Sequence, residues 1–194
     1  MNLNGYKIIL ASSSTRRIEF LKKMNIPFTT KKIKCNEDFD TNLKGHLIPR
    51  FIVKKKAEIF INKIKNKEII ITADTIVWYK NKCLGKPKNN KEALNMLIEL
   101  SNNVHQVITA VGFLTKKKLE IIHKITKVKF GKVSKDELIS YINKDKPFDK
   151  AGSYGIQDWF GLIAVESLNG SYSNIVGLPT YEVYNKLKEI TLKN

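Results

Sequence analysis

Several kinds of segment are missing from this sequence, and each absence removes a class of protein. No apolar run approaches the roughly 18 residues that a membrane-spanning helix needs, so we expect no contact with a membrane. The amino-terminal MNLNGYKIILASSS places one lysine before a very short apolar run, which makes a poor signal peptide. We therefore expect a cytoplasmic protein. Its two cysteines, Cys35 and Cys83, lie far apart without CxxC spacing, which predicts free thiols.

Familiar catalytic and cofactor-binding motifs are missing as well. The chain contains no GxxxxGK(S/T), no GxGxxG after a strand, no HExxH and no nucleophile elbow around a serine. Its three histidines, His46, His105 and His123, are scattered along the sequence. What remains is a set of polar residues in places where packing alone would not put them.

Acidic residues are few compared with basic ones. Thirty-five Lys and Arg residues against 18 Asp and Glu residues give a formal net charge of +17, which favours polyanionic partners. The excess is mostly lysine, scattered among Asn and Ile in stretches such as VKKKAEIFINKIKNK, and a genome rich in A and T produces the same pattern. Charge alone therefore does not establish binding to nucleic acid.

Strand and helix patterns are interspersed along the chain, and neither a repeat nor a linker divides it. Strands are predicted over 7–11, 68–79, 104–115, 119–130 and 161–165, the third and fourth as a hairpin. Helices are predicted from Arg16 to before Pro27, over 50–65, over 91–101, from the capping box at Ser134 to about Asn143, and over 180–190, with residues 34–49 as a loop. The sequence predicts one domain, 1–194, with a three-layer α/β/α fold around a mixed, twisted sheet.

Asp74 lies inside the apolar run IITADTIVW, where an ionised carboxylate is costly to bury without a cation or several hydrogen-bond donors. One interpretation is an aspartate at a strand end that faces solvent. The other is a divalent-metal ligand or general base at the carboxyl end of a core strand, because ligands bind at that edge of α/β sheets.

Hydroxyl and basic residues follow the first predicted strand in LASSSTRR. A strand-to-helix turn at Ser12–Ser14 offers hydroxyls and free backbone N–H groups, which are the donors of a phosphate site. Arg16 and Arg17 add planar donors for phosphate oxygens, and an anion bound there offsets their conflict with the helix dipole. Together with Lys56, Lys86 and an acidic metal site, these residues describe a polyphosphate pocket.

A later loop, DKAGSYGIQ (149–157), combines an adjacent acid and base with two glycines and a glutamine. Such a loop brings backbone N–H groups close to a ligand, and Gln157 offers both a donor and an acceptor. An ordinary surface turn is the alternative interpretation.

Six motifs occur in the order in which one known family has them. They are LASSSTRR, ADTIV, LGKP, HQVITAV, DKAGSYGIQ and NGSYSNIVGLP, and they run from about residue 8 to 181. In these motifs the chain resembles the Maf family of nucleoside triphosphate pyrophosphatases. The resemblance implies hydrolysis between the α- and β-phosphates, which gives a nucleoside monophosphate and pyrophosphate. It also implies a divalent metal cation (Mg²⁺ or Mn²⁺), a possible homodimer and a fold shared with the inosine-triphosphate pyrophosphatases.

The resemblance also implies roles for individual residues. The catalytic proton acceptor of the family falls on Asp74. Polar pocket positions fall on Arg16, Glu37, Lys56, Lys86 and Gln157. We expect Asp74 and Glu37 to hold the metal, and Ser12, Arg16, Lys56 and Lys86 to bind phosphate.

Members that act on dTTP and UTP resemble this chain at Arg17, Thr75 and Gln157, the residues expected to set substrate specificity. We therefore expect hydrolysis of dTTP, UTP and modified pyrimidine nucleotides. The branch that prefers 7-methyl-GTP resembles the chain less, because its late loop lacks YGIQ.

The chain departs from the family pattern in two places. Thr15 stands where proline is usual, and a threonine still fits a first helical turn. Asp158 and Trp159 follow Gln157 where glycine is usual, a change that reshapes the loop or the base pocket.

Two alternative functions remain open. One is a 7-methyl-GTP-type pyrophosphatase of the same family. The other is a non-catalytic basic protein that binds nucleic acid or regulates cell division, which the net charge of +17 supports. No helix-turn-helix, RRM or KH signature is evident, and the lysines do not interleave with stacking aromatics, so nucleic acid is not the expected partner.

Overall fold

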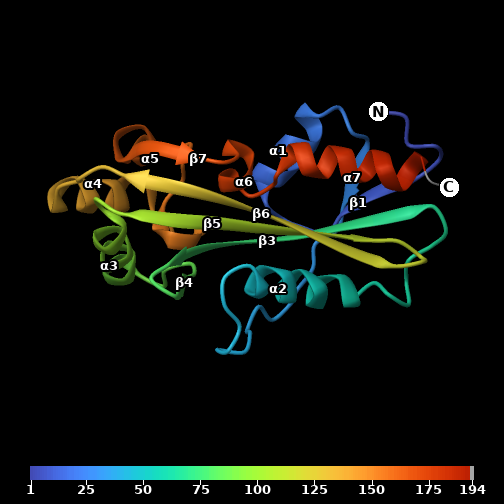
Figure 1. The fold of residues 1–194 in the computed structure, drawn as a ribbon, viewed down its shortest axis with the longest axis horizontal. Helices are drawn as coiled ribbons and strands as arrows, with labels where there is room; N and C mark the ends of the chain where they lie inside the picture. Colours follow the sequence, from blue (N-terminus) through green and yellow to red (C-terminus); the bar gives the residue numbers. More distant parts are fainter. Residues whose placement is uncertain (193–194) are drawn as a thin grey trace.

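Strand β3 (Glu68–Tyr79) runs along the centre of the sheet, with the other elements arranged around it (Figure 1). The computed structural model describes residues 1–192. The sequence of β3, EIIITADTIVWY, is rich in β-branched residues, which suit a pleated, packed surface. The adjacent residues Ile69, Ile70 and Ile71, which alternate between the two faces, are at most 2% exposed, because both faces of the sheet are covered. The strand predicted over 68–79 is confirmed.

The described residues form one seven-stranded sheet in the order β2-β1-β3-β5-β6-β7, with β4 paired to the far end of β3. The bounds of the other strands are β1 (Lys7–Leu10), β2 (Phe28–Thr30), β4 (Lys82–Leu84), β5 (Val104–Leu114), β6 (Leu119–Phe130) and β7 (Val165–Asn169). Strand β1 is parallel to β2 and β3, whereas β3, β5, β6 and β7 are antiparallel neighbours. The mixed sheet and its hairpin are confirmed.

Helices cover both faces of this sheet, and a further group packs at one end (Figure 1). Their bounds are α1 (Thr15–Lys23), α2 (Leu47–Glu58), α3 (Asn90–Leu100), α4 (Lys135–Asp145), α5 (Trp159–Ala164), α6 (Tyr172–Val176) and α7 (Thr180–Leu192). Helices α1 and α7 pack on one face and share one apolar cluster. Helix α2 packs on the other face and contributes to two clusters, while α3, α4 and α5 share a fourth. The three-layer α/β/α fold is confirmed, as is the capping box that begins α4.

The helix predicted over 50–65 has different bounds, since α2 runs from Leu47 to Glu58. It begins earlier because Pro49 falls in the first turn, where a backbone N–H has no intrahelical acceptor. It ends earlier because the chain tightens, with Phe60 N–H donating to Ala57 O at 2.9 Å. This tighter turn buries the Phe60 ring, which is 2% exposed.

The strand predicted over 161–165 is wrong for most of its length, because these residues belong to α5 and β7 begins only at Val165. A short apolar run such as GLIAV fits a buried strand or a short helix equally well. Here Phe160 and Ala164, one helical turn apart, both enter the core. The short elements β2, β4 and α6 were not predicted.

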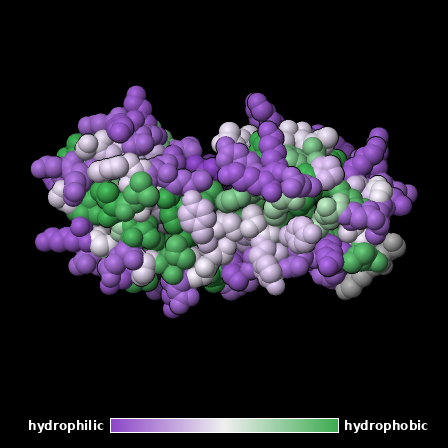
Figure 2. Space-filling view, turned by 90° about the horizontal axis from the view of Figure 1, so that it is seen from above, coloured by the Kyte–Doolittle hydropathy of each residue, from purple (hydrophilic) through white to green (hydrophobic). Residues whose placement is uncertain are grey.

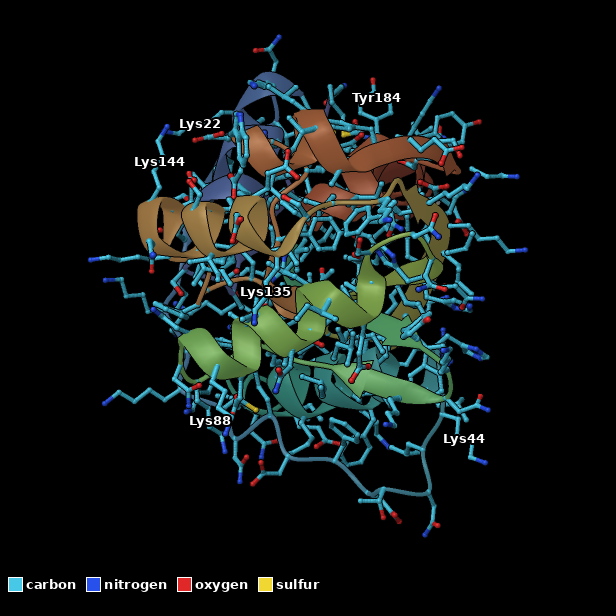
Figure 3. All side chains as sticks on the ribbon, turned by 90° about the vertical axis from the view of Figure 1, so that its left-hand side faces the viewer. Lys22, Lys44, Lys88, Lys135, Lys144 and Tyr184 are labelled. Atoms are coloured by element: carbon cyan, nitrogen blue, oxygen red, sulfur yellow. The ribbon has the colours of Figure 1, made fainter. Side chains whose placement is uncertain are left out.

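Hydrophilic side chains cover much of the face seen in Figure 2. The lysines labelled in Figure 3 extend away from the ribbon on several sides rather than from one face. Figure 2 shows apolar side chains gathered toward the end where α4, α5 and β7 lie, and Trp159, Leu162 and Leu168 are among the exposed apolar residues of that end. No helix within residues 1–192 has both the length and the apolar character to cross a membrane.

Candidate active site

A cleft of about 590 Å³ opens beside β3 where the sheet is interrupted. One edge of β3 pairs with β1 as far as Ile71 and with β4 from Val77 onward, and no described strand pairs with that edge in between. The cleft lies at this gap. Its lining includes every residue predicted for the site, namely Ser12, Arg16, Arg17, Glu37, Lys56, Asp74, Thr75, Lys86 and Gln157.

Strand alternation sends the two polar residues of the ADT motif to opposite faces of the sheet. Asp74 bonds to Lys56 of α2, on one face, and Thr75 bonds to Arg17 of α1, on the other. The side chain of Asp74 is 11% exposed, so the interpretation as a solvent-facing aspartate is wrong. The predicted carboxyl-end position is also wrong, because Asp74 lies in the middle of β3 and reaches the cleft through the gap that β1 leaves.

Lys56 joins two carboxylates on the α2 side of the cleft. Its Nζ lies 2.9 Å from Asp74 Oδ1 and 2.8 Å from Glu37 Oε1, and it donates to the backbone oxygen of Ala73 at 3.3 Å. The Lys56 side chain is 9% exposed, whereas that of Glu37 is 47% exposed. Two carboxylates therefore share one ammonium here, and the charges of Arg17 and Lys86 also act on Glu37.

The two carboxyl groups have pKa values shifted in opposite directions. Burial raises the pKa of Asp74 above its ordinary value, and the charges of Lys56 and Arg17 offset this only in part. Burial also acts on Glu37, but the hydrogen bond and the charge of Lys56 outweigh it, so the pKa of Glu37 lies below its ordinary value. Two carboxyl groups whose pKa values are shifted apart in this way suit a site in which one accepts a proton while the other stays ionised.

The turn between β1 and α1 presents donors on the opposite side of the cleft. Ser14 is the N-cap of α1, where its Oγ accepts from Arg17 N–H at 3.5 Å, and Ser14 N–H donates to Ser12 Oγ at 3.2 Å. The first helical turn carries free N–H groups and the positive end of the helix dipole, which favour an anion. Ser12 to Arg16 line the cleft, so this turn faces any bound ligand.

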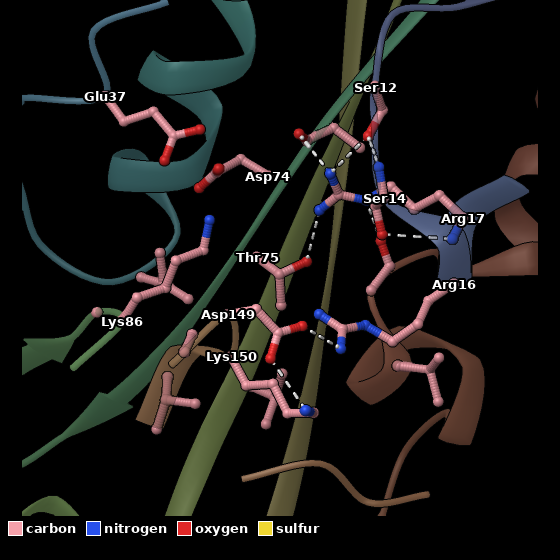
Figure 4. A pocket seen from close by; sticks show the side chains of 18 of the residues that line it. Ser12, Ser14, Arg16, Arg17, Glu37, Asp74, Thr75, Lys86, Asp149 and Lys150 are labelled. Atoms are coloured by element: carbon pink, nitrogen blue, oxygen red, sulfur yellow. Dashed lines mark hydrogen bonds and ion pairs between the residues drawn. The ribbon is translucent and has the colours of Figure 1, made fainter. Parts of the chain in front are cut away.

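The sequence pattern predicts that the guanidinium of Arg17 donates to phosphate oxygens, but its donors are bonded to groups of the protein. Its Nε donates to Gly177 O at 2.9 Å, its Nη1 to Ala73 O at 3.1 Å and to Ser12 Oγ at 3.4 Å, and its Nη2 to Thr75 Oγ1 at 3.1 Å (Figure 4). Burial lowers the pKa of Arg17, and the charge of Asp74 opposes this. Arg17 thus ties α1 to β3 and to the segment after α6, and Arg16 is left as the arginine that is open to phosphate.

A buried hydrogen-bond chain continues from Thr75 and was not predicted. Thr109 Oγ1 donates to Asn174 O at 2.9 Å, so its single proton is used and Thr75 Oγ1 donates to Thr109 Oγ1 across 2.9 Å. Asn174 is fully buried within α6. These hydrogen bonds connect Thr75, a predicted specificity residue, to the motif NGSYSNIVGLP, which is the sequence signal that would have pointed to them.

Arg16, Lys86 and Gln157 face the open part of the cleft. Arg16 Nη1 lies 3.1 Å from Asp149 Oδ2, and the two side chains are 31% and 63% exposed. Figure 4 shows the amine of Lys86 directed toward Asp74 and Glu37. Gln157 is exposed on the same cleft. The structure thus gathers the predicted residues from several separate segments, and their individual roles stay predictions.

The carboxylates fit a metal that is shared with a substrate. Within residues 1–192 no three His, Cys, Asp or Glu residues come together in a way that could hold a metal ion. Asp74 and Glu37 nevertheless converge on one positive charge, that of Lys56. Mg²⁺ is commonly held by one or two carboxylates together with substrate phosphates, which is the arrangement these oxygens allow.

The three histidines do not line the cleft, whereas Cys35 and Cys83 do. His46 and His123 stack with ring centroids 4.5 Å apart, so these two are not scattered in space, but neither lines the cleft. His105 is buried against Tyr154. The predicted free thiols are confirmed for Cys35 and Cys83, and burial raises the pKa of Cys83 to about 11.

Comparison with known proteins shows the family to which the chain belongs. Two proteins named "dTTP/UTP pyrophosphatase" are similar along nearly the whole chain. The one from Flavobacterium johnsoniae is 45% identical over 95% of this chain and 95% of its own length. The one from Bacteroides fragilis is 42% identical over 97% of this chain and 98% of its own length. Among solved structures, the Staphylococcus aureus Ham1 protein is 12% identical with a TM-score of 0.46, over 64% of this chain and 71% of that one. The profile of the family described as Maf-like protein matches residues 7–190, and the chain belongs to this family.

Proposed function

We propose that this protein hydrolyses dTTP and UTP to the nucleoside monophosphate and pyrophosphate. The observation that carries the proposal is one cleft with an acidic cluster on one side and, on the other, the amino terminus of α1 with Arg16. Relatives named "dTTP/UTP pyrophosphatase" support the substrates.

The triphosphate binds between the two sides. The N–H groups at the start of α1 and the guanidinium of Arg16 donate hydrogen bonds to phosphate oxygens. The ion pair between Arg16 and Asp149 breaks when phosphate binds. Lys86 approaches from the LGKP turn toward the same space. These positive groups oppose the charge that develops on the phosphates as the anhydride bond breaks.

Asp74 is the group that accepts the proton of the attacking water. Its raised pKa makes it a better base than an ordinary aspartate, and Lys56 fixes the direction of its carboxylate at 2.9 Å. As the water oxygen bonds to phosphorus, the bond to the bridging oxygen breaks and pyrophosphate leaves. When bound, Mg²⁺ or Mn²⁺ held by Asp74 and Glu37 would neutralise charge on the phosphate oxygens.

The base is read on the far side of the cleft. Gln157 offers an amide donor and acceptor to the pyrimidine edge, while Arg17 and Thr75 shape the pocket through their mutual bond of 3.1 Å. Because nucleoside triphosphates are intracellular metabolites, the proposal places the protein in the cytoplasm. The possible homodimer implied by the resemblance stays a prediction.

A panel of nucleoside triphosphates with product analysis tests this proposal. Purified protein with Mg²⁺ or Mn²⁺ should release pyrophosphate from dTTP and UTP faster than from CTP, GTP or 7-methyl-GTP. Asp74→Asn keeps an acceptor for Lys56 but removes the base, so its kcat should fall by roughly 10² to 10⁴. Circular dichroism should show that this variant is folded.

Three outcomes would count against the proposal. Orthophosphate as the first product would refute the assigned bond, and 7-methyl-GTP as the best substrate would indicate the other branch of the family. Salt-dependent DNA binding without any turnover would favour a basic regulator.

A further inference from the structure

The turn that carries Gln157 is held at both ends by one buried hydroxyl. Tyr141 of α4 is 1% exposed, and its Oη accepts from Gly155 N–H at 3.2 Å and donates to Asp158 Oδ2 at 2.9 Å. The backbone closes the same turn, because Asp158 N–H donates to Gly155 O at 3.1 Å. Ile156 and Gln157 therefore form its tip, and both line the cleft.

The carboxylate of Asp158 is used for this turn rather than for the helix that follows. Asp158 occupies the N-cap position of α5, yet its side chain makes no capping hydrogen bond. It packs instead against Gly155, where an added Cβ would lie 2.5 Å from Asp158 Oδ2. The φ of Asp158 is −80°, so the backbone at 158 does not require the glycine that is usual there in the family.

Helix α4 gives the hydroxyl a fixed position. The ring of Tyr141 stacks on Phe160 of α5, with centroids 4.8 Å apart and planes 25° apart. Burial and the nearby charge of Asp158 raise the pKa of Tyr141, so the hydroxyl keeps the proton that it donates. The tie between Tyr141 and Asp158 therefore persists across the neutral pH range.

Three ion pairs connect the turn to the phosphate side of the cleft. Lys150 Nζ lies 3.5 Å from Asp158 Oδ2 and 3.0 Å from Asp149 Oδ1. Asp149 in turn reaches Arg16 through its other oxygen, at 3.1 Å. Asp158 is thus the point at which the buried hydroxyl, the Gln157 turn and the charged rim of the cleft meet.

We propose that Asp158 is a positioning residue for base selection, which holds the Gln157 turn in place through Tyr141. Asp158 also lines the cleft, but its carboxylate is bonded to Tyr141 and paired with Lys150, so it acts through the Gln157 turn. This inference rests on the proposed function, in which Gln157 reads the pyrimidine.

A double-mutant cycle on Asp158 and Gln157 tests the inference. We would measure kcat/KM for UTP and CTP in the wild type, Asp158→Gly, Gln157→Ala and the double variant. Asp158→Gly should lower the UTP-to-CTP ratio about tenfold, through KM more than kcat, because one hydrogen bond to a charged group is lost. In the Gln157→Ala background the same substitution should leave the ratio unchanged.

Two more variants separate positioning from general damage. Tyr141→Phe keeps the ring that stacks on Phe160 and removes only the hydroxyl, so it should reproduce the loss of selectivity. Both Asp158→Gly and Tyr141→Phe should speed hydrogen exchange at the amides of residues 155–158. Glu166→Gln is the matched control, because it removes a carboxylate that pairs with Lys129 at 2.6 Å on β6 and β7. It should change neither readout.

The outcomes are distinguishable from failure of the proposed function. An unchanged UTP-to-CTP ratio in Asp158→Gly, or an equal fall in both backgrounds, would overturn the positioning role. If the wild type hydrolyses neither nucleotide, the proposed function fails. Calorimetric affinities for UTP and CTP in the same four proteins, read with the exchange rates, then decide the role of Asp158.

Discussion

The two sides of the cleft differ in how deeply their charged side chains are buried and in the elements that hold them. On one side Lys56 and Asp74 lie on α2 and β3, are about one-tenth exposed and have partners fixed by helix and sheet packing. On the other side Asp149 and Lys150 of one loop pair with Arg16, in the first turn of α1, and with Asp158, at the start of α5. The side chains of Arg16 and Asp149 are 31% and 63% exposed.

This difference separates two tasks. A carboxyl pKa is raised only where burial outweighs nearby positive charge, which requires regular, well-packed elements. In the proposed function the base is selected by Gln157, which lies on an exposed loop whose turn is bonded to Tyr141. The sequence departs from the family pattern at Asp158, on the loop side.

The largest effect should follow from Lys56→Met, which removes the cation from the buried side. Asp74 and Glu37 then lose their shared partner, and the uncompensated buried carboxylate should lower the free energy of unfolding by about 3 kcal/mol. Loss of the group that orients the base should also lower kcat/KM at least about 100-fold. Denaturant unfolding and pyrophosphate release measure the two effects.

Lys54→Met on the same helix is the matched control. Lys54 is 63% exposed and pairs with Glu58 only at 4.0 Å, so stability should change by less than about 1 kcal/mol and activity should not change. Equal losses in the two variants would contradict the distinction between a buried and a solvated lysine.

A smaller effect is expected from Arg16→Met on the exposed side. Its pair with Asp149 is largely solvated, so the free energy of unfolding should change by no more than about 0.5 kcal/mol. The KM for UTP should rise about tenfold, because a charged donor to phosphate is lost. Steady-state kinetics measures the change in KM, and a melting curve measures the change in stability. A large fall in stability would show that the charged side chains on the two sides of the cleft contribute alike to folding.

The adjacent lysines of α2 show what could and could not be predicted. The cost of burying Asp74 predicts a nearby cation, and the resemblance points to Lys56. Local sequence does not distinguish Lys56 from the other two lysines of the run KKK. Which of the three enters the cleft depends on how helix α2 is rotated about its axis when it packs on the sheet. Lys54 is 63% exposed and Lys56 is 9% exposed. The start of that helix, at Leu47, was missed as well.

The paired arginines give the same lesson on the other side. Local sequence patterns predict the strands, the helices and the turn that could bind phosphate, because these elements follow from periodicity and capping residues. They do not predict that Arg17 is bonded to Ala73 and Gly177, residues far along the chain, while Arg16 pairs with Asp149. Nor do they predict the tie from Tyr141 to Asp158, since that contact depends on how α4 packs against α5.

The smallest effect concerns pH and the buried carboxyl alone. The pKa of Asp74 is raised in the folded protein above the 3.8 of an ordinary aspartate, so between these two values the folded state binds more protons than the unfolded state. The contribution of Asp74 to stability therefore falls as pH rises through this interval. Asp74→Asn lacks the titration, so its melting temperature relative to the wild type should rise with pH over the same interval.

Activity should run the other way, because catalysis needs Asp74 ionised and is lost as pH falls through the raised pKa. Glu37 and the other carboxyls with lowered pKa values cancel largely in the comparison between the two proteins, since both carry them. The effect is small because Lys56 and Arg17 offset much of the burial cost. A melting difference that does not vary with pH, or falls as pH rises, would mean that the charge of Lys56 fully compensates Asp74. The buried side would then have no advantage over the exposed side in tuning a base.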